Sequence, residues 1–168
     1  MCSSDLTGKS YSADWSPDPA RHCNDRTWSA EQQRSGPQWH GWGNGPANQR
    51  FQSAADAGLD KRSVPKLELA WAFAFPGETI AESQPTLSGG RLFVGSRSGR
   101  VYALDAQSGC VYWTFDAGAP VKSSVLIAPY RGNDGERLGA YFSDLGGTSY
   151  GVDAASGNEL RSEEHTSE

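Results

Sequence analysis

An internal repeat constrains the fold of this 168-residue chain more than any other feature of its sequence. The motif Ala-x-Asp-x-x-x-Gly-x-x-x-Trp occupies residues 103–113, and residues 151–157 repeat its first part with Gly in place of Ala. Asp105 and Asp153 are 48 residues apart, and the two motif glycines have the same separation. Because a fixed period of about 40–50 residues is typical of stacked supersecondary units, the chain is predicted to be a repeat protein.

Each position of the motif has a physical role in a strand-turn-strand unit. The aspartate can accept hydrogen bonds from turn amides, and the glycine can adopt the left-handed conformation that leads into the next strand. Trp113 opens that strand and is predicted to pack against the neighbouring sheet. Trp71 lies 42 residues before Trp113 and is predicted to do the same in the preceding unit. The motif residues are therefore interpreted as structural rather than catalytic.

From residue 67 onward, short apolar runs separated by Gly, Ser and Asp recur about every ten residues, which is typical of all-β proteins. Tight hairpin turns are predicted at 88–90 and 97–99, and a longer polar surface loop at 129–137. The predicted fold is all-β, a partial β-propeller of about two four-stranded blades. The strands are predicted over 67–75, 84–87, 91–95, 100–104, 111–115, 122–128, 138–143, 149–152 and a run after Asn158.

Residues 7–66 are predicted to be an irregular segment that leads into the propeller. They are rich in Ser, Pro, Asp and Trp, and the part up to Asn48 shows no helical or strand period of apolar residues. One short helix is predicted over 53–59, because Ser53 can cap its beginning and Gly58 can end it.

The two ends of the chain resemble translated sequencing adapter. Residues 161–168, RSEEHTSE, match the in-frame translation of a common library adapter, and residues 1–6, MCSSDL, match its opposite end. The second repeat would place a tryptophan at position 161, where the chain has Arg161. We therefore expect both ends to be artefacts, and residues 67–160 to be a fragment of a longer propeller that is inactive by itself.

Composition argues against nucleic acid and a membrane span, and it favours a disulfide over a metal site for the cysteines. With 15 basic and 20 acidic residues, the net charge of −5 offers no basic surface for nucleic acid. No apolar run approaches the roughly 18 residues of a membrane span. Cys2 lies in the end segment that is set aside. The two remaining cysteines, Cys23 and Cys110, could form a disulfide in an exported protein. The alternative, a metal site of His22, Cys23 and His40, matches no compact ligand spacing, so no metal site is predicted.

The repeat resembles that of quinoprotein dehydrogenases, eight-bladed propellers that hold pyrroloquinoline quinone (PQQ) on their axis. The order WGxxxxNxRF at 42–51 and SQPxxxGGRLFVGSxxGxVYALDAxxGCVYWTF at 83–115 resembles the polyvinyl-alcohol dehydrogenase branch. The resemblance implies an enzyme, periplasmic or otherwise exported, that oxidises an alcohol with PQQ and passes electrons to a cytochrome c. Non-catalytic relatives share the repeat, so a scaffold propeller of the cell envelope is the alternative.

The resemblance also implies one cofactor-binding residue in this chain. Glu82, in the sequence Glu-Ser-Gln-Pro, matches an E-x-x-P element whose glutamate hydrogen-bonds the quinone; the alternative is a solvated loop carboxylate next to Pro85. Where methanol-oxidising members have adjacent cysteines, this chain has Ser123 and Ser124. The catalytic aspartate and the ligands of Ca²⁺, which assists many members, are expected in later blades beyond residue 160. The catalytic residues therefore remain unknown from this sequence.

Overall fold

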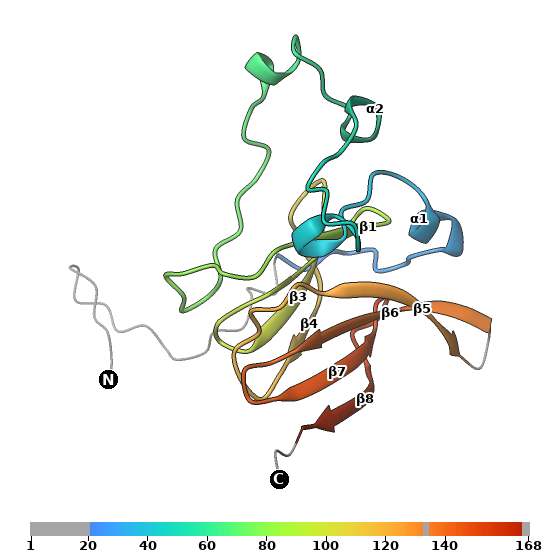
Figure 1. The fold of residues 1–168 in the computed structure, drawn as a ribbon, viewed down its shortest axis with the longest axis vertical. Coiled ribbons are helices and arrows are strands. Elements are labelled where there is room, and N and C mark those ends of the chain that lie inside the picture. Colours follow the sequence, from blue (N-terminus) through green and yellow to red (C-terminus); the bar gives the residue numbers. More distant parts are fainter. Residues whose placement is uncertain (1–20, 133–134, 166–168) are drawn as a thin grey trace.

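The computed structural model describes residues 21–132 and 135–165, and these contain two four-stranded antiparallel sheets (Figure 1). Each sheet is a meander in which every strand pairs with the next one along the chain. The expected all-β architecture of two propeller blades is therefore confirmed. The first sheet contains β1 (Thr86–Ser88), β2 (Arg91–Gly95), β3 (Arg100–Asp105) and β4 (Val111–Asp116); the second contains β5 (Leu126–Gly132), β6 (Gly135–Ser143), β7 (Thr148–Asp153) and β8 (Glu159–Glu164).

The two sheets repeat one another down to a register irregularity. In the first sheet the pairing of β3 with β4 shifts just after the pair Ala103 and Trp113. In the second sheet the pairing of β7 with β8 shifts just after Gly151 and Arg161. Arg161 thus occupies the tryptophan position of the repeat, as the sequence spacing predicts. Residues 1–20 and 166–168 lie outside the described residues, and the adapter origin of the two ends stays a prediction.

The main core lies between the two sheets. It combines side chains from alternate positions of both sheets, including Phe93, Val101, Phe142 and Val152, each at most 5% exposed. Full burial of side chains of this size contributes about 1.5–3 kcal/mol each. Trp28 of the N-terminal segment joins the same cluster, so that segment is part of the folded unit.

A tryptophan connects each blade to the turn of the next repeat. The Trp113 ring of β4 packs on Gly157, so closely that a Cβ there would lie 2.7 Å from a ring atom. Its indole N–H donates to the carbonyl of Ala154 at 3.0 Å. Trp71 packs on Gly109 in the same way, which confirms that it acts as the tryptophan of the preceding unit.

The prediction of a strand over 67–75 is wrong. The segment has no ladder with any other described residue, and its first half is exposed. Its second half follows the strand period, because Trp71, Phe73 and Phe75 pack against a second cluster on the first sheet while the alternate residues face outward. Alternation of apolar and polar residues indicates that one face of an extended segment is packed. A β-strand also needs a hydrogen-bonded neighbouring strand, which the alternation does not reveal.

The predicted surface loop at 129–137 is also wrong. Strand β5 continues to Gly132 and β6 begins at Gly135, so this segment is a long hairpin in which Pro129 pairs with Leu138. Proline argues against a central strand because it has no N–H to donate. Strand β5 is an edge of its sheet, where a missing donor is tolerated.

The N-terminal segment contains only short helices. These are α1 (Ala30–Arg34), η2 (Gly41–Gly43), α2 (Ala54–Ala57) and η3 (Val64–Lys66). The prediction of a helix at 53–59 is confirmed, because the Ser53 hydroxyl accepts from a backbone amide of α2 and Gly58 ends the helix with φ of 64°. Helix α1, which a Ser29 capping box begins, was not anticipated from the sequence.

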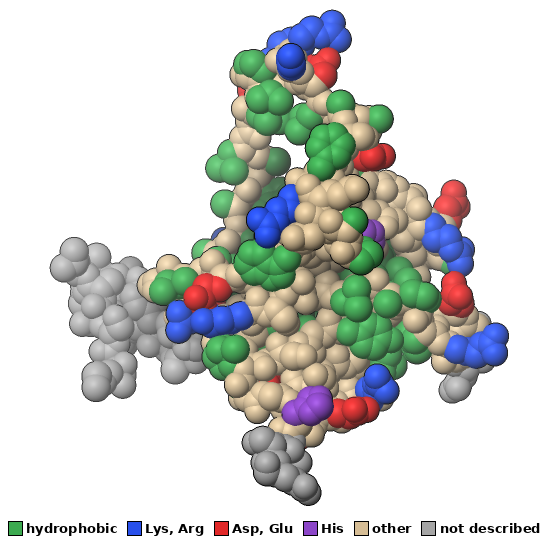
Figure 2. Space-filling model, in the orientation of Figure 1, with side chains coloured by type: hydrophobic (Ala, Val, Ile, Leu, Met, Phe, Trp, Pro, Cys, Tyr) green, Lys and Arg blue, Asp and Glu red, His purple; other side chains and the backbone are tan. Residues whose placement is uncertain are grey.

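The part of this segment that contains α2 and η3 projects away from the sheets (Figure 1). Hydrophobic side chains are visible along the projection in the space-filling view (Figure 2). Among its exposed large hydrophobic residues are Phe51, Leu59, Val64, Leu67 and Leu69. None of these five residues belongs to the main core between the sheets.

The tryptophan contact predicts a graded response to glycine substitution. Gly157→Ala should destabilise the chain by about 2–4 kcal/mol, because it combines a strained left-handed backbone with a clash against the Trp113 ring. Gly90→Ala is the matched control, since Gly90 has φ of 75° but nothing within 4 Å of the added Cβ. It should cost only about 1 kcal/mol. Chemical denaturation measures both, and equal losses would mean that the ring contact contributes nothing.

Candidate functional site

Glu82 lies just before β1, where the two sheets approach each other. Its carboxylate forms an ion pair with Lys122 Nζ at 3.0 Å and a second one with Arg97 Nη1 at 3.5 Å. Lys122 lies just before β5, and β1 and β5 contact each other. Residues that are far apart in the sequence and belong to two different blades therefore form one charged cluster. The cluster is partly accessible, because the Glu82, Arg97 and Lys122 side chains are 34%, 45% and 37% exposed.

The turn between β2 and β3 positions Arg97. The Glu78 carboxylate accepts hydrogen bonds from the backbone N–H groups of Arg97 at 2.9 Å and of Ser98 at 2.8 Å. Burial acts to raise the pKa of Glu78, but the hydrogen bonds from Ser98 and the turn amides outweigh it, so this pKa is lowered. Glu78 is therefore ionised, and its carboxylate fixes the turn that carries Arg97.

A chain of serine hydrogen bonds connects the inner strand ends of the two blades. The Ser83 hydroxyl donates to the Ser123 carbonyl at 2.9 Å and accepts from the Gly95 amide at 3.2 Å. The Ser123 hydroxyl bonds within its own sheet, since it donates to the Ser143 carbonyl of β6 at 3.0 Å and accepts from the Ser143 amide at 3.2 Å. These bonds hold Glu82 and Lys122, the neighbours of Ser83 and Ser123, in fixed relative positions.

Ser124, the residue after Ser123, contacts the N-terminal segment. The Ser124 hydroxyl faces Gly41 of the N-terminal segment so closely that a Cβ on Gly41 would lie 2.6 Å from its oxygen. Thr86 of β1 donates to the Val125 carbonyl next to it at 2.6 Å. The correspondence of Ser123 and Ser124 to the paired cysteines of methanol-oxidising quinoproteins stays a prediction.

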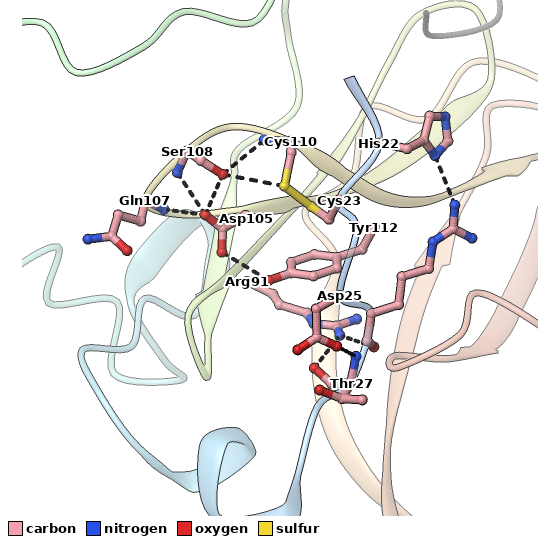
Figure 3. Close-up of a disulfide and its surroundings, with 11 residues drawn as sticks. His22, Cys23, Asp25, Thr27, Arg91, Asp105, Gln107, Ser108, Cys110 and Tyr112 are labelled. Atoms are coloured by element: carbon pink, nitrogen blue, oxygen red, sulfur yellow. Dashed lines mark hydrogen bonds between the residues drawn. A yellow bond between two sulfur atoms is a disulfide. The ribbon is translucent and has the colours of Figure 1, made fainter. Parts of the chain in front are cut away.

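The two cysteines form a disulfide, as the sequence allowed. Cys23 and Cys110 are 5.2 Å apart at their Cα atoms and 87 residues apart in sequence. The Cys23 amide also donates to the Val111 carbonyl, so the N-terminal segment is fixed beside β4 (Figure 3). His22 hydrogen-bonds with the Arg26 side chain. Within the described residues, no group of three His, Cys, Asp or Glu side chains could hold a metal ion.

A buried arginine next to the disulfide was missed in the sequence. Arg91, 1% exposed, donates to the Ala155 carbonyl in the second sheet at 2.8 Å and to the Arg26 carbonyl in the N-terminal segment at 2.9 Å. Its guanidinium lies 3.8 Å from the centre of the Tyr112 ring (Figure 3) and 4.6 Å from that of Trp28. Nothing in the local pattern distinguishes it from an exposed arginine at the start of a strand.

Burial lowers the pKa of Arg91 to about 10, while the charges of Tyr112 and of the nearby aspartates act to raise it. The guanidinium is therefore still charged at neutral pH. Because it donates to carbonyls in both the N-terminal segment and the second sheet, it stabilises their packing on the first sheet. Its partners are structural, and it takes no part in the Glu82 cluster.

The motif aspartates organise their turns, as predicted. Asp105 accepts from the Ser108 amide and hydroxyl, both at 2.7 Å, and Asp153 makes the same pair of bonds with Ser156. Asp153 also accepts from the Tyr130 hydroxyl at 2.7 Å. Arg137 pairs with it at 3.0 Å. Burial acts to raise the pKa of Asp153, but the hydrogen bonds from Tyr130 and Ser156 and the charge of Arg137 outweigh it and lower this pKa.

The residues around Glu82 suit the chemistry of PQQ, which is a polycarboxylate o-quinone. The ammonium of Lys122 and the guanidinium of Arg97 offer hydrogen-bond donors to carboxylate or quinone oxygens, and the Glu82 carboxylate offers an acceptor. The cluster also lies between the inner strands of two blades, where a ligand on the propeller axis would be reached. This donor set therefore fits one side of the cofactor.

Fold and site together define the chain as part of a β-propeller with a polar cluster at the inner strand ends. Over residues 39–143 the chain matches the glucose/ethanol/alcohol dehydrogenase β-propeller domain, and it belongs to this family of PQQ proteins. Its similarity to the family therefore includes Glu82, the serines and both blades up to β6. The sequence-based recognition of a quinoprotein alcohol dehydrogenase propeller is confirmed.

Two curated relatives are polyvinylalcohol dehydrogenases. The one from Pseudomonas sp. is 43% identical over 123 residues, which cover 73% of this chain and 19% of that protein. The one from Sphingopyxis sp. (strain 113P3) is 40% identical over 123 residues, which cover 73% of this chain and 18% of that protein. The chain thus spans about a fifth of the length of these relatives.

The fold also matches a solved quinoprotein. The crystal structure of quinohemoprotein alcohol dehydrogenase from Comamonas testosteroni superposes with a TM-score of 0.59 at 23% identity, over 76% of this chain and 19% of that one. At this identity the match supports the fold alone. Among the described residues, no helix has the length and apolar character that a membrane crossing requires.

Removing the disulfide should destabilise the chain without unfolding the sheets. The double variant Cys23→Ser/Cys110→Ser is expected to lose about 2–4 kcal/mol of unfolding free energy, because the bridge closes a loop of 87 residues in the unfolded state. Urea denaturation with and without a reductant measures this loss. Reductant should destabilise the parent chain by a similar amount and leave the variant unchanged; a parent chain insensitive to reductant would contradict the bridge.

The lowered pKa of Asp153 predicts an acid-dependent contribution to stability. Because the folded pKa lies below the unfolded value of about 3.9, the contribution is complete above that value and is lost as the pH falls through the folded pKa. Asp153→Asn should therefore lower stability at pH 7 and flatten its decline between about pH 5 and pH 2. Urea denaturation across this range is the measurement, with the exposed Glu136→Gln as control. An unchanged acid slope in Asp153→Asn would contradict this role.

Proposed function

We propose that the protein to which this chain belongs is a PQQ-dependent alcohol dehydrogenase. The observation that carries the proposal is the Glu82 cluster, in which a carboxylate, two cations and two serines lie at the inner strand ends of two propeller blades. Family membership and the polyvinylalcohol dehydrogenase relatives support it. We propose a secondary alcohol as substrate, with polyvinyl alcohol as one candidate.

In this function, the residues of this chain hold the cofactor and do not react with the substrate. Bound PQQ would supply the two-electron oxidation. Glu82 would accept a hydrogen bond from bound cofactor, while the serine hydrogen bonds fix the relative positions of the segments that carry Glu82 and Lys122. We propose that the catalytic aspartate and any Ca²⁺ ligands belong to later blades, beyond residue 160. A cytochrome c is the proposed electron acceptor, and the periplasm or the exterior is the proposed location, which the disulfide supports.

The test is PQQ binding and turnover by the full-length protein. The apoprotein should bind PQQ in a fluorescence titration and should reduce an artificial electron acceptor with a secondary alcohol only when PQQ is present. Glu82→Gln should lower kcat/KM at least about tenfold, because it removes a charged hydrogen-bond acceptor of the cofactor. Glu136→Gln, an exposed carboxylate of β6, is the control and should leave kcat/KM unchanged.

One outcome would contradict the proposed activity, and another would contradict only the role of Glu82. A correctly folded full-length protein that does not bind PQQ would favour the alternative of a non-catalytic scaffold propeller in the cell envelope. Binding and turnover that are equal in Glu82→Gln and in the parent protein would leave PQQ dependence intact but remove Glu82 from the cofactor site.

A further inference from the structure

The charge around Glu82 carries an inference that rests on the proposed function and deepens it. A lone carboxylate would repel a polycarboxylate cofactor, because like charges at a few ångströms disfavour each other. Glu82 is not alone, since Lys122 and Arg97 both pair with it and bring two positive charges to one negative charge. Glu78 does not join this group, because its carboxylate accepts from the backbone amides of the turn.

We propose that Lys122 and Arg97 bind a carboxylate of the cofactor and that Glu82 holds both cations in position for it. An ammonium has three N–H donors and a guanidinium has five. In the part of the chain that the structure describes, each cation makes one ion pair, which is with Glu82. Both cations therefore keep donors for an incoming anion, and both side chains are partly exposed.

The fold supplies the rigidity that such a site needs. Arg97 lies in the turn between β2 and β3, and its backbone N–H donates to the Glu78 carboxylate. Lys122 precedes Ser123, whose hydroxyl and carbonyl are both hydrogen-bonded to neighbouring strands. Because the two cations come from different blades, a carboxylate bridging them also joins β2 and β3 of one blade to β5 of the next. Cofactor binding is thus expected to stabilise the contact between the blades.

The experiment measures PQQ affinity in the full-length apoprotein by fluorescence titration. Lys122→Gln and Arg97→Gln should each raise the Kd for PQQ at least about tenfold, since each removes a charge-assisted hydrogen bond. Lys122→Arg should restore most of the affinity because it keeps the cation. Arg62→Gln is the matched control: it removes an arginine that pairs with Asp60 at 3.2 Å on the projecting segment, and it should leave the Kd unchanged.

Two further readouts separate cofactor binding from a purely structural role of the ion pairs. The Kd of the parent protein should rise with salt concentration, and that rise should be smaller in Lys122→Gln. The trimethyl ester of PQQ, which lacks the carboxylate charges, should bind the parent protein and Lys122→Gln equally. If the ion pairs were purely structural, Lys122→Gln would lower the thermal stability of the apoprotein. The salt dependence of the Kd would then be the same in Lys122→Gln as in the parent protein, and the ester would show no difference from PQQ in how the two proteins compare.

The outcomes distinguish this inference from the proposed function. If the parent protein does not bind PQQ, the proposed function fails. If the parent protein binds PQQ, and Lys122→Gln and Arg97→Gln bind it equally well at every salt concentration, the inference alone is overturned.

Discussion

The structure depends on the packing of a tryptophan ring against the glycine turn of the next repeat. Trp113 reaches from the last strand of one blade to the turn at Gly157 in the other, and its indole N–H donates to the Ala154 carbonyl. The ring needs a turn with no side chain, which explains why the motif pairs glycine with tryptophan across neighbouring units. Trp71 makes the same contact on Gly109. The contact of Trp113 thus joins the last strand of one blade to the turn between the last two strands of the next.

The candidate site is a consequence of that blade-to-blade geometry. Once the blades are in place, β1 and β5 lie next to each other, and the residues just before them converge. Glu82 and Lys122 meet there across the blade boundary, with the serine bonds as their support. The disulfide and the buried Arg91 have a different role, because they fix the N-terminal segment against the sheets. Stability and the charged cluster are thus provided by different residues.

Much of the fold follows from local patterns, and the two errors have clear physical reasons. Turn glycines and alternating apolar residues were sufficient to place β2 at its observed bounds and to place two four-stranded units. The segment 67–75 showed strand alternation but has no hydrogen-bonded partner in the described residues. The segment 129–137 looked like a loop because of Pro129, which an edge strand tolerates. In both cases the missing information was which strand lies next to the segment.

For the site, the sequence indicated Glu82 through the E-x-x-P element, and it indicated Ser123 and Ser124 through the family resemblance. It gave no sign of Lys122, Arg97 or Arg91 as partners, because ion pairs and cation–π contacts join residues that are distant in sequence. The repeat, its turns and its tryptophan contacts are encoded locally, by residue types with strong conformational preferences. The charge balance around Glu82 arises only when two blades pack, because no single blade contains both the carboxylate and the lysine.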